Sequence, residues 1–189
     1  MGMNVADHLL ERLREWGVHR IFGYPGDGIN GIVGALGRAD HDPRFVQARH
    51  EEMAAFMACG HAKFTGEIGV CLATSGPGAI HLLNGLYDAR LDHQPVLAIV
   101  GQQALTALGG HYQQEVDLTT LFKDVAREYV QLVTSPEQLP NVVDRAIRIA
   151  VTQRAPTCLI FPNDVQEADA VTPRPPHAFK MVPGSLGFA

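Results

Sequence analysis

Apolar residues recur along the chain in two alternating patterns, one with helical spacing and one of short, unbroken runs. The helical spacing predicts helices at 5–16, 29–36, 51–63, 82–91 and 142–151, and the short runs predict strands at 18–22, 45–48, 68–73, 96–100 and 157–161. Apolar strands that alternate with helices are typical of a parallel sheet covered on both faces. We therefore predict a single α/β domain with three layers, α/β/α, around a mainly parallel sheet.

Local signals give several of these elements their ends. Asn4 and Asp7 are capping residues for the first helix, and Gly17 ends it. Ser135-Pro136-Glu137-Gln138 is a helix start with proline in the first turn. Residues 102–120 carry a glycine pair and many polar groups, which indicates a long functional loop.

The pattern also predicts the domain organisation. Residues 1–171 form the domain, and residues 172–189, with four prolines and little apolar periodicity, are expected to be a linker or tail. A chain of 189 residues is long enough for one sizeable core.

The amino-acid composition limits the classes of ligand and partner that the protein is expected to bind. A net charge of -5 argues against nucleic acid, since phosphate binding needs a concentrated basic face, and so favours small molecules. The three cysteines are widely spaced and are expected to be buried thiols. No run approaches the roughly 20 apolar residues that span a bilayer, and the N-terminus lacks a secretion signal, so we expect a cytoplasmic protein.

Two glycine-rich turns follow predicted strands and precede helices. Residues 26–31 satisfy Gly-x-Gly-x-x-Gly, with Glu51 20 residues further on, as in dinucleotide-binding domains. Asp27 would repel a pyrophosphate, and Pro25 removes a backbone donor, so this reading is an alternative and not our first choice.

Other chemistries fit less well. Gly26-Asp27-Gly28 opens the magnesium fingerprint of thiamine diphosphate enzymes, but residues 54–58 hold no suitable oxygen donor to complete it. Ala73 stands where a hydrolase turn around Ser75 needs glycine. His50-Glu51-Glu52 lacks the second histidine of a zinc helix, so we expect no metal ligand in this chain.

Several motifs together resemble the N-terminal, pyrimidine-binding domain of thiamine diphosphate-dependent enzymes of the pyruvate oxidase and acetolactate synthase type. They run in family order from about residue 4 to residue 166, at residues 22–27, 49–55, 74–78, 84–89, 95–99, 114–122 and 135–138. The resemblance places the cofactor-activating role on Glu51, whose carboxyl group would share a proton with the aminopyrimidine ring. Without the resemblance, Glu51 would be an acidic residue favouring a first helical turn, and Glu52 is a rival by type.

The resemblance also implies further site residues. Those expected to border the cofactor, besides Glu51, are Tyr24, Pro25, Gly26, Thr74, Ser75, Gly76, Pro77, Gly78 and His81. A histidine at position 81 favours the oxidases, since acetolactate synthases tend to have asparagine there. Gln114 would approach the substrate, and Gln113 replaces the aromatic residue that commonly precedes it.

In the resembled enzymes each site lies between this domain and a diphosphate-binding domain. We therefore expect thiamine diphosphate as cofactor, Mg²⁺ held by a domain outside this chain, possible use of FAD in a full enzyme, a 2-oxo acid such as pyruvate as substrate, and a homodimer. The isolated domain is expected to be inactive. The alternatives are a subunit of a two-subunit 2-oxo acid decarboxylase, a non-catalytic module and a dinucleotide-binding domain.

Overall fold

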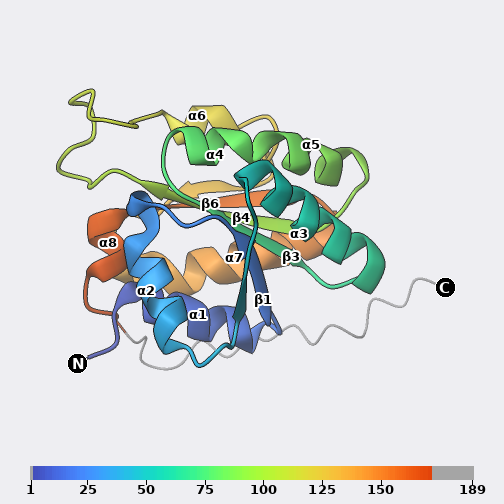
Figure 1. The fold of residues 1–189 in the computed structure, drawn as a ribbon, viewed down its shortest axis with the longest axis horizontal. Helices are drawn as coiled ribbons and strands as arrows, with labels where there is room; N and C mark the ends of the chain where they lie inside the picture. The colour runs from blue at the N-terminus through green and yellow to red at the C-terminus, as the bar shows by residue number, and fades with distance from the viewer. Residues whose placement is uncertain (1, 172–189) are drawn as a thin grey trace.

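A computed structural model describes residues 2–171 of the protein, which form three layers (Figure 1). The central sheet has six strands in the order β2-β1-β3-β4-β6-β5, and every neighbouring pair is parallel. The strands are β1 (Arg20–Gly23), β2 (Arg44–Gln47), β3 (Gly69–Ala73), β4 (Val96–Gln102), β5 (Val130–Leu132) and β6 (Pro156–Pro162). The predicted three-layer α/β/α fold with a parallel sheet is confirmed.

Helices cover both faces of the sheet (Figure 1). On one face lie α1 (Val5–Glu15), α2 (Asn30–Arg38), α7 (Leu139–Gln153) and α8 (Asn163–Glu167), and on the other lie α3 (Glu51–Thr65), α4 (Pro77–His81), α5 (Leu83–Leu91) and α6 (Leu118–Phe122). Two short 3-10 turns, η1 (Asp27–Ile29) and η2 (Pro136–Gln138), precede α2 and α7.

The central strands β3, β4 and β6 are buried at every position because each face of the sheet has its own core. In β3, Val70 and Leu72 belong to the core under α1, α2 and α7, whereas Cys71 and Ala73 belong to the core under α3 and α5. Side chains alternate between the faces of a strand, so a strand covered on both sides loses the polar alternation of a half-exposed one.

The capping residues of the first helix are confirmed. Asn4 Oδ1 accepts a hydrogen bond from the Asp7 backbone N–H at 2.8 Å, and Asp7 Oδ2 accepts one from the Asn4 N–H at 3.2 Å. After the helix, Gly17 adopts a φ of 79°, the left-handed conformation that glycine takes most easily. These contacts fix both ends of α1.

Four details differ from the sequence-based prediction. The helix expected at 82–91 is α5, and a separate short helix that was not predicted, α4, precedes it; the two are divided at Leu82, whose N–H bonds to Ala79 O, one residue short of the α-helical partner. The loop predicted for 102–120 ends early, since α6 begins at Leu118. Strand β5 and helix α8 were not predicted. Strand β5 is three half-buried residues at the sheet edge and therefore lacks a continuous apolar run.

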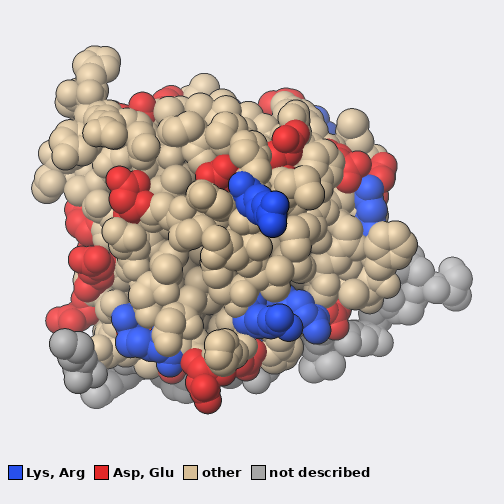
Figure 2. All heavy atoms as spheres, in the orientation of Figure 1, with Lys and Arg blue, Asp and Glu red and all other residues tan. Residues whose placement is uncertain are grey.

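Surface features agree with the composition. All three cysteines are free and buried, as expected, and burial raises the pKa of Cys59 and Cys71 to about 12. Basic and acidic side chains are scattered over the face in Figure 2, most of which is uncharged. Within the described residues, every helix is too short or too polar to span a bilayer. The linker predicted at 172–189 lies outside the described residues.

Candidate functional site

The two glycine turns meet at the carboxyl edge of the sheet. Strands β1 and β3 are neighbours, and β2 lies on the other side of β1, so the strand order reverses at this point. Ligands of open α/β sheets bind in the crevice outside the carboxyl ends of the strands at such a reversal. The turn after β1 and the turn after β3 both lie there, and the Gly28 N–H donates to Thr74 Oγ1 at 3.0 Å.

Close packing of these turns explains two of their glycines. A Cβ at Gly26 would lie 2.6 Å from Thr74 Cβ, and one at Gly28 would lie 2.7 Å from Ser75 Oγ. Both separations are shorter than real Cβ contacts allow, so a side chain at either position would push the turns apart. The glycines of the first turn therefore serve contact between the two turns.

Glu51 lies at the same edge as the first residue of α3. It is 7% exposed, and its Oε2 is 3.0 Å from Nδ1 of His81 on α4. The neighbouring Glu52 points elsewhere, because its Oε1 accepts a hydrogen bond from Asn84 Nδ2 at 2.7 Å. Of the two adjacent carboxyl groups, only that of Glu51 is buried beside the glycine turns.

Gly78 of the second turn lies beside the other oxygen of Glu51. A Cβ at Gly78 would lie 3.1 Å from Glu51 Oε1 and 2.7 Å from Thr74 Cγ2. Among the described residues, hydrogen bonding to this carboxyl group involves Oε2, through His81, and leaves Oε1 for a ligand.

His50 joins the group. It is the N-cap of α3, and its Nδ1 accepts a hydrogen bond from the Glu52 N–H at 3.3 Å. Its ring lies against that of His81, with centroids 4.3 Å apart and planes tilted by 33°. Sequence reasoning did not select His50, because its partner stands on another helix and not four residues away.

Gln114 approaches the second turn from the long loop. Ser75 Oγ donates to Gln114 Oε1 at 3.5 Å, and a Cβ at Gly76, whose φ is 60°, would lie 2.7 Å from Gln114 O. Gln103, which was not predicted, donates from Nε2 to Ser75 Oγ at 3.2 Å. Ser75 is fully buried and contacts two amides, which differs from the histidine contact that a serine nucleophile needs.

The remaining predicted residues line the first turn. Tyr24 is 39% exposed, and its backbone N–H donates to Leu72 O at 3.3 Å, which extends the sheet contact one residue beyond β1. Pro25 follows it at the edge of the crevice. Asp27 Oδ1 accepts from the Gly28 N–H at 2.9 Å, so the turn donor that a pyrophosphate would need is already bonded to a carboxylate.

The buried side-chain amide of Gln166, which was not predicted as a site residue, holds the turn after β1 in place. Gln166 of α8 is fully buried; its Nε2 donates to Gly28 O at 2.8 Å and to Phe161 O at 2.9 Å, and its Oε1 accepts from the Ile32 N–H at 3.3 Å. A lone glutamine after the last strand carries no sequence signal for this role. Gln166 ties the turn after β1 to the end of β6.

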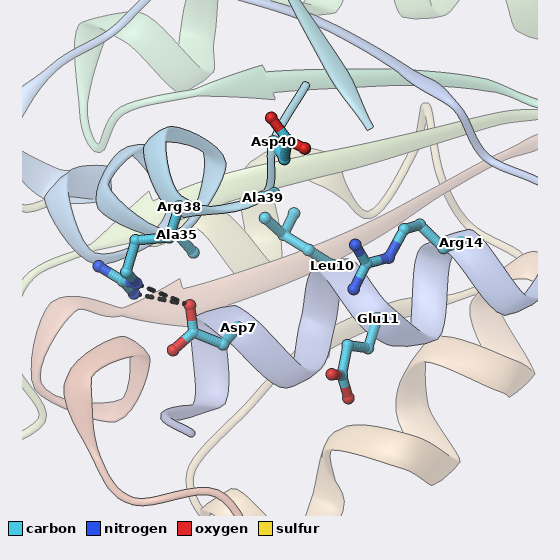
Figure 3. A pocket seen from close by; sticks show the side chains of 8 residues that line it. All are labelled: Asp7, Leu10, Glu11, Arg14, Ala35, Arg38, Ala39 and Asp40. Atoms are coloured by element: carbon cyan, nitrogen blue, oxygen red, sulfur yellow. Dashed lines mark hydrogen bonds and ion pairs between the residues drawn. The ribbon is translucent and has the colours of Figure 1, made fainter. Parts of the chain in front are cut away.

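A surface hollow lies elsewhere, between α1 and the C-terminal half of α2 (Figure 3). It has a volume of about 270 Å³, and charged side chains of both signs line it; Arg38 Nη2 and Asp7 Oδ1 are 2.7 Å apart across it. Because α2 begins at the glycine turn and runs away from it, this hollow lies at the far end of α2 from Glu51.

Comparison with known proteins agrees with this geometry. Residues 3–121 match the family model described as "Thiamine pyrophosphate enzyme, N-terminal TPP binding domain". The chain is 45% identical over 157 residues to a putative thiamine pyrophosphate-containing protein of Bacillus subtilis. The matched residues make up 83% of this chain and 27% of that protein.

Two relatives carry more specific names. A pyruvate oxidase of Lactiplantibacillus plantarum is 41% identical over 157 residues, covering 83% of this chain and 26% of the oxidase. The large subunit of acetolactate synthase isozyme 2 of Escherichia coli is 41% identical over 169 residues, covering 88% of this chain and 30% of that subunit. This chain thus spans less than a third of the length of each of these three relatives. It belongs to the family of N-terminal, thiamine pyrophosphate-binding domains of thiamine pyrophosphate enzymes.

Proposed function

We propose that this chain is the cofactor-activating half of a thiamine diphosphate-dependent enzyme that acts on a 2-oxo acid such as pyruvate. The observation that carries the proposal is the buried carboxyl group of Glu51, held through Oε2 by His81 with Oε1 beside the space left by Gly78. Family membership and the named relatives give the reaction class, oxidation or carboligation after decarboxylation. A histidine at position 81 adds a preference for the oxidase branch.

The residues of this chain fit the aminopyrimidine end of the cofactor. Oε1 of Glu51 exchanges a proton with the ring nitrogen, while the bond from Oε2 to His81 Nδ1 holds the carboxyl group in place. Thr74, Ser75 and Pro77 form the turn against which the ring packs, and Tyr24, Pro25 and Gly26 form the facing turn. When bound, thiamine diphosphate would supply the nucleophilic carbon and the electron sink that decarboxylation of a 2-oxo acid needs.

Gln114 is the substrate-side residue of the proposal. Its contact with Ser75 Oγ brings its amide to the same turn that borders Glu51. An amide can donate a hydrogen bond to the carboxylate of a 2-oxo acid. The neighbouring Gln103 shares the Ser75 hydroxyl and so helps to hold this side of the site.

The other half of the site lies outside this chain in the proposal. A diphosphate-binding domain, in cis or in a separate subunit, holds Mg²⁺ and the diphosphate, and FAD belongs to that larger enzyme where it is used. The matched residues make up less than a third of each of the three relatives, so each relative is long enough to hold a separate diphosphate-binding domain. This supports the division of the site between two domains. The isolated chain is then inactive, and a two-subunit decarboxylase or a non-catalytic module are the competing functions.

A homodimer through the glycine-turn helices is part of the proposal. Met53 and Phe56 are three residues apart on α3 and are 54% and 40% exposed. Ile80 and Tyr87, 41% and 37% exposed, flank Asn84, whose bond to Glu52 joins the α5 surface to that of α3. Exposed apolar side chains concentrated beside a site mark an interaction surface.

The function is tested by combining this chain with a diphosphate-binding domain and measuring carbon dioxide release from pyruvate with thiamine diphosphate and Mg²⁺. We expect Glu51→Gln to reduce the rate by about 100-fold or more, since an amide cannot exchange the proton. Glu52→Gln, which changes the adjacent half-buried carboxyl group, is the matched control and should retain activity. Gly78→Ala should weaken cofactor activation because its methyl group would crowd Glu51 Oε1.

Two outcomes would overturn the proposal. Full activity of the Glu51→Gln enzyme would remove the assigned role of this carboxyl group. Absence of cofactor-dependent carbon dioxide release from every 2-oxo acid tried, with a partner domain that is active in its own enzyme, would favour the non-catalytic module.

A further inference from the structure

Two imidazoles and one carboxylate converge at the N-terminus of α3. The side chains of His50, Glu51 and His81 each offer one ligand atom, and these three atoms lie within 4.8 Å of one another. Within residues 2–171 this is the one group of three or more histidine, cysteine or acidic side chains so close together. Elsewhere the chain has two-residue pairs, such as His61 with Glu67 at 3.2 Å and His19 with Asp42 at 2.8 Å.

We propose that His50, Glu51 and His81 form a binding site for a divalent transition-metal ion of the zinc class. Two histidine nitrogens and one carboxylate oxygen are a ligand set that zinc uses in sites with an open fourth position. Magnesium and calcium prefer all-oxygen surroundings, so the imidazoles select against them. The site is distinct in kind from the Mg²⁺ that would accompany the cofactor's diphosphate.

The distances suit such an ion after a small adjustment. Ligand atoms bound tetrahedrally at 2.0–2.1 Å from zinc lie about 3.4 Å apart. The Glu51 Oε2 and His81 Nδ1 atoms are already 3.0 Å apart. The third ligand must move by about 1–1.5 Å at most, which a rotation of the exposed His50 side chain can supply.

The burial of Glu51 favours a metal site whose ligands are held in place over a pair of mobile surface side chains. Glu51 is almost fully buried and therefore has few rotamers to lose, while His81 is 42% exposed and leaves the fourth position open to water. The two rings already lie against each other, so binding requires little reorganisation of His81. The positive end of the α3 dipole opposes a cation, and the carboxylate of Glu51 offsets that effect.

The test uses the untagged 189-residue chain and measures Zn²⁺ binding by isothermal titration calorimetry, with Co²⁺ absorption as a second probe. We expect one ion per chain and visible Co²⁺ bands of a four-coordinate site with nitrogen and oxygen ligands. His50→Gln and His81→Gln should each weaken Zn²⁺ binding at least about tenfold, because each removes one of three ligands.

His61→Gln is the matched control, since it removes a histidine of α3 that pairs with the single carboxylate of Glu67 and has no third ligand among the described residues. It should bind Zn²⁺ like the unchanged chain, and thermal unfolding of each variant checks that it is folded. Unchanged Zn²⁺ binding in both His50→Gln and His81→Gln, or an equal loss in His61→Gln, would overturn the site. Absence of one-to-one binding by the unchanged chain would do the same.

Metal binding by the chain is measured without any catalytic readout, so the metal site and the proposed function can fail independently. If both hold, Zn²⁺ bound at Oε2 would withdraw the negative charge that Glu51 needs for proton exchange through Oε1. Zn²⁺ would then inhibit the complemented enzyme, and a chelator would restore activity.

Discussion

At the scale of single residues, the sequence motifs selected Glu51 as the candidate for cofactor activation but gave no information about the contacts around it. A family motif names Glu51 and His81 separately, and the structure places their side chains 3.0 Å apart. His50 was considered only for a zinc helix and set aside, because the position four residues on holds Ala54 and not a second histidine. Contacts between side chains on different helices depend on how the helices pack, which spacing along one helix does not encode.

Another single residue, His8, makes stability depend on pH. Burial in α1 lowers its pKa from the ordinary value of 6.5, and its Nδ1 has no hydrogen-bond partner among the described residues. His8 therefore takes up its proton at a higher pH in the unfolded chain than in the folded chain. We expect the free energy of unfolding to fall as the pH drops through 6.5, until the folded histidine also becomes protonated.

His8→Leu should lessen this loss, so the difference in unfolding free energy between pH 7.5 and pH 5 should be smaller than in the unchanged chain. Urea unfolding at both values measures it. His93→Asn, which replaces an exposed histidine, is the control. An identical pH dependence in His8→Leu and the unchanged chain would contradict the prediction.

At the level of elements, helix–helix contacts on the face away from Glu51 depend on a buried ion pair. Arg12 of α1 donates to both carboxylate oxygens of Asp144 on α7, from Nε at 2.6 Å and from Nη2 at 2.5 Å. Trp16 Nε1 donates to the same carboxylate at 2.8 Å. The side chains of Arg12 and Asp144 are only 12% and 11% exposed.

Asp144→Ala should lower the free energy of unfolding by about 3–5 kcal/mol, because it leaves the Arg12 guanidinium buried without its main partner. Urea unfolding followed by fluorescence of Trp16, the one tryptophan, measures it. The double variant Arg12→Met/Asp144→Leu should lose less than Asp144→Ala, since it leaves neither charge behind. A single-variant loss under about 1 kcal/mol would mean that the pair contributes little.

Elements with a strong local pattern were predicted well, and those without one were missed. Strands β3, β4 and β6 are buried at every position and mostly apolar, because both faces of the sheet are covered. Strand β5 is short and half-buried, and its place beside β6 comes from pairing and not from composition. The break between α4 and α5 likewise depends on the backbone hydrogen bond from the Leu82 N–H to Ala79 O. The spacing of apolar residues carries no information about such a bond.

The whole molecule is expected to associate through its exposed apolar surface on α3, α4 and α5. Phe56→Glu should shift the chain from dimer to monomer, because a buried unpaired charge is costly at an apolar interface. Sedimentation velocity across a range of concentrations measures the change. Phe64→Glu, which alters a 92% exposed aromatic at the far end of α3, is the control, and equal effects of both variants would contradict this location of the interface.

The sequence by itself determined the fold class, the burial of the central strands and the identity of the buried glutamate, because periodicity and motif order are local or linear properties. Tertiary structure decided what surrounds that glutamate. The reversal of strand order between β1 and β3 brings two distant glycine turns together, and packing of α4 beside α3 brings His81 to Glu51 and His50. Such convergence depends on the order of strands in the sheet, which the linear pattern of apolar and polar residues leaves open.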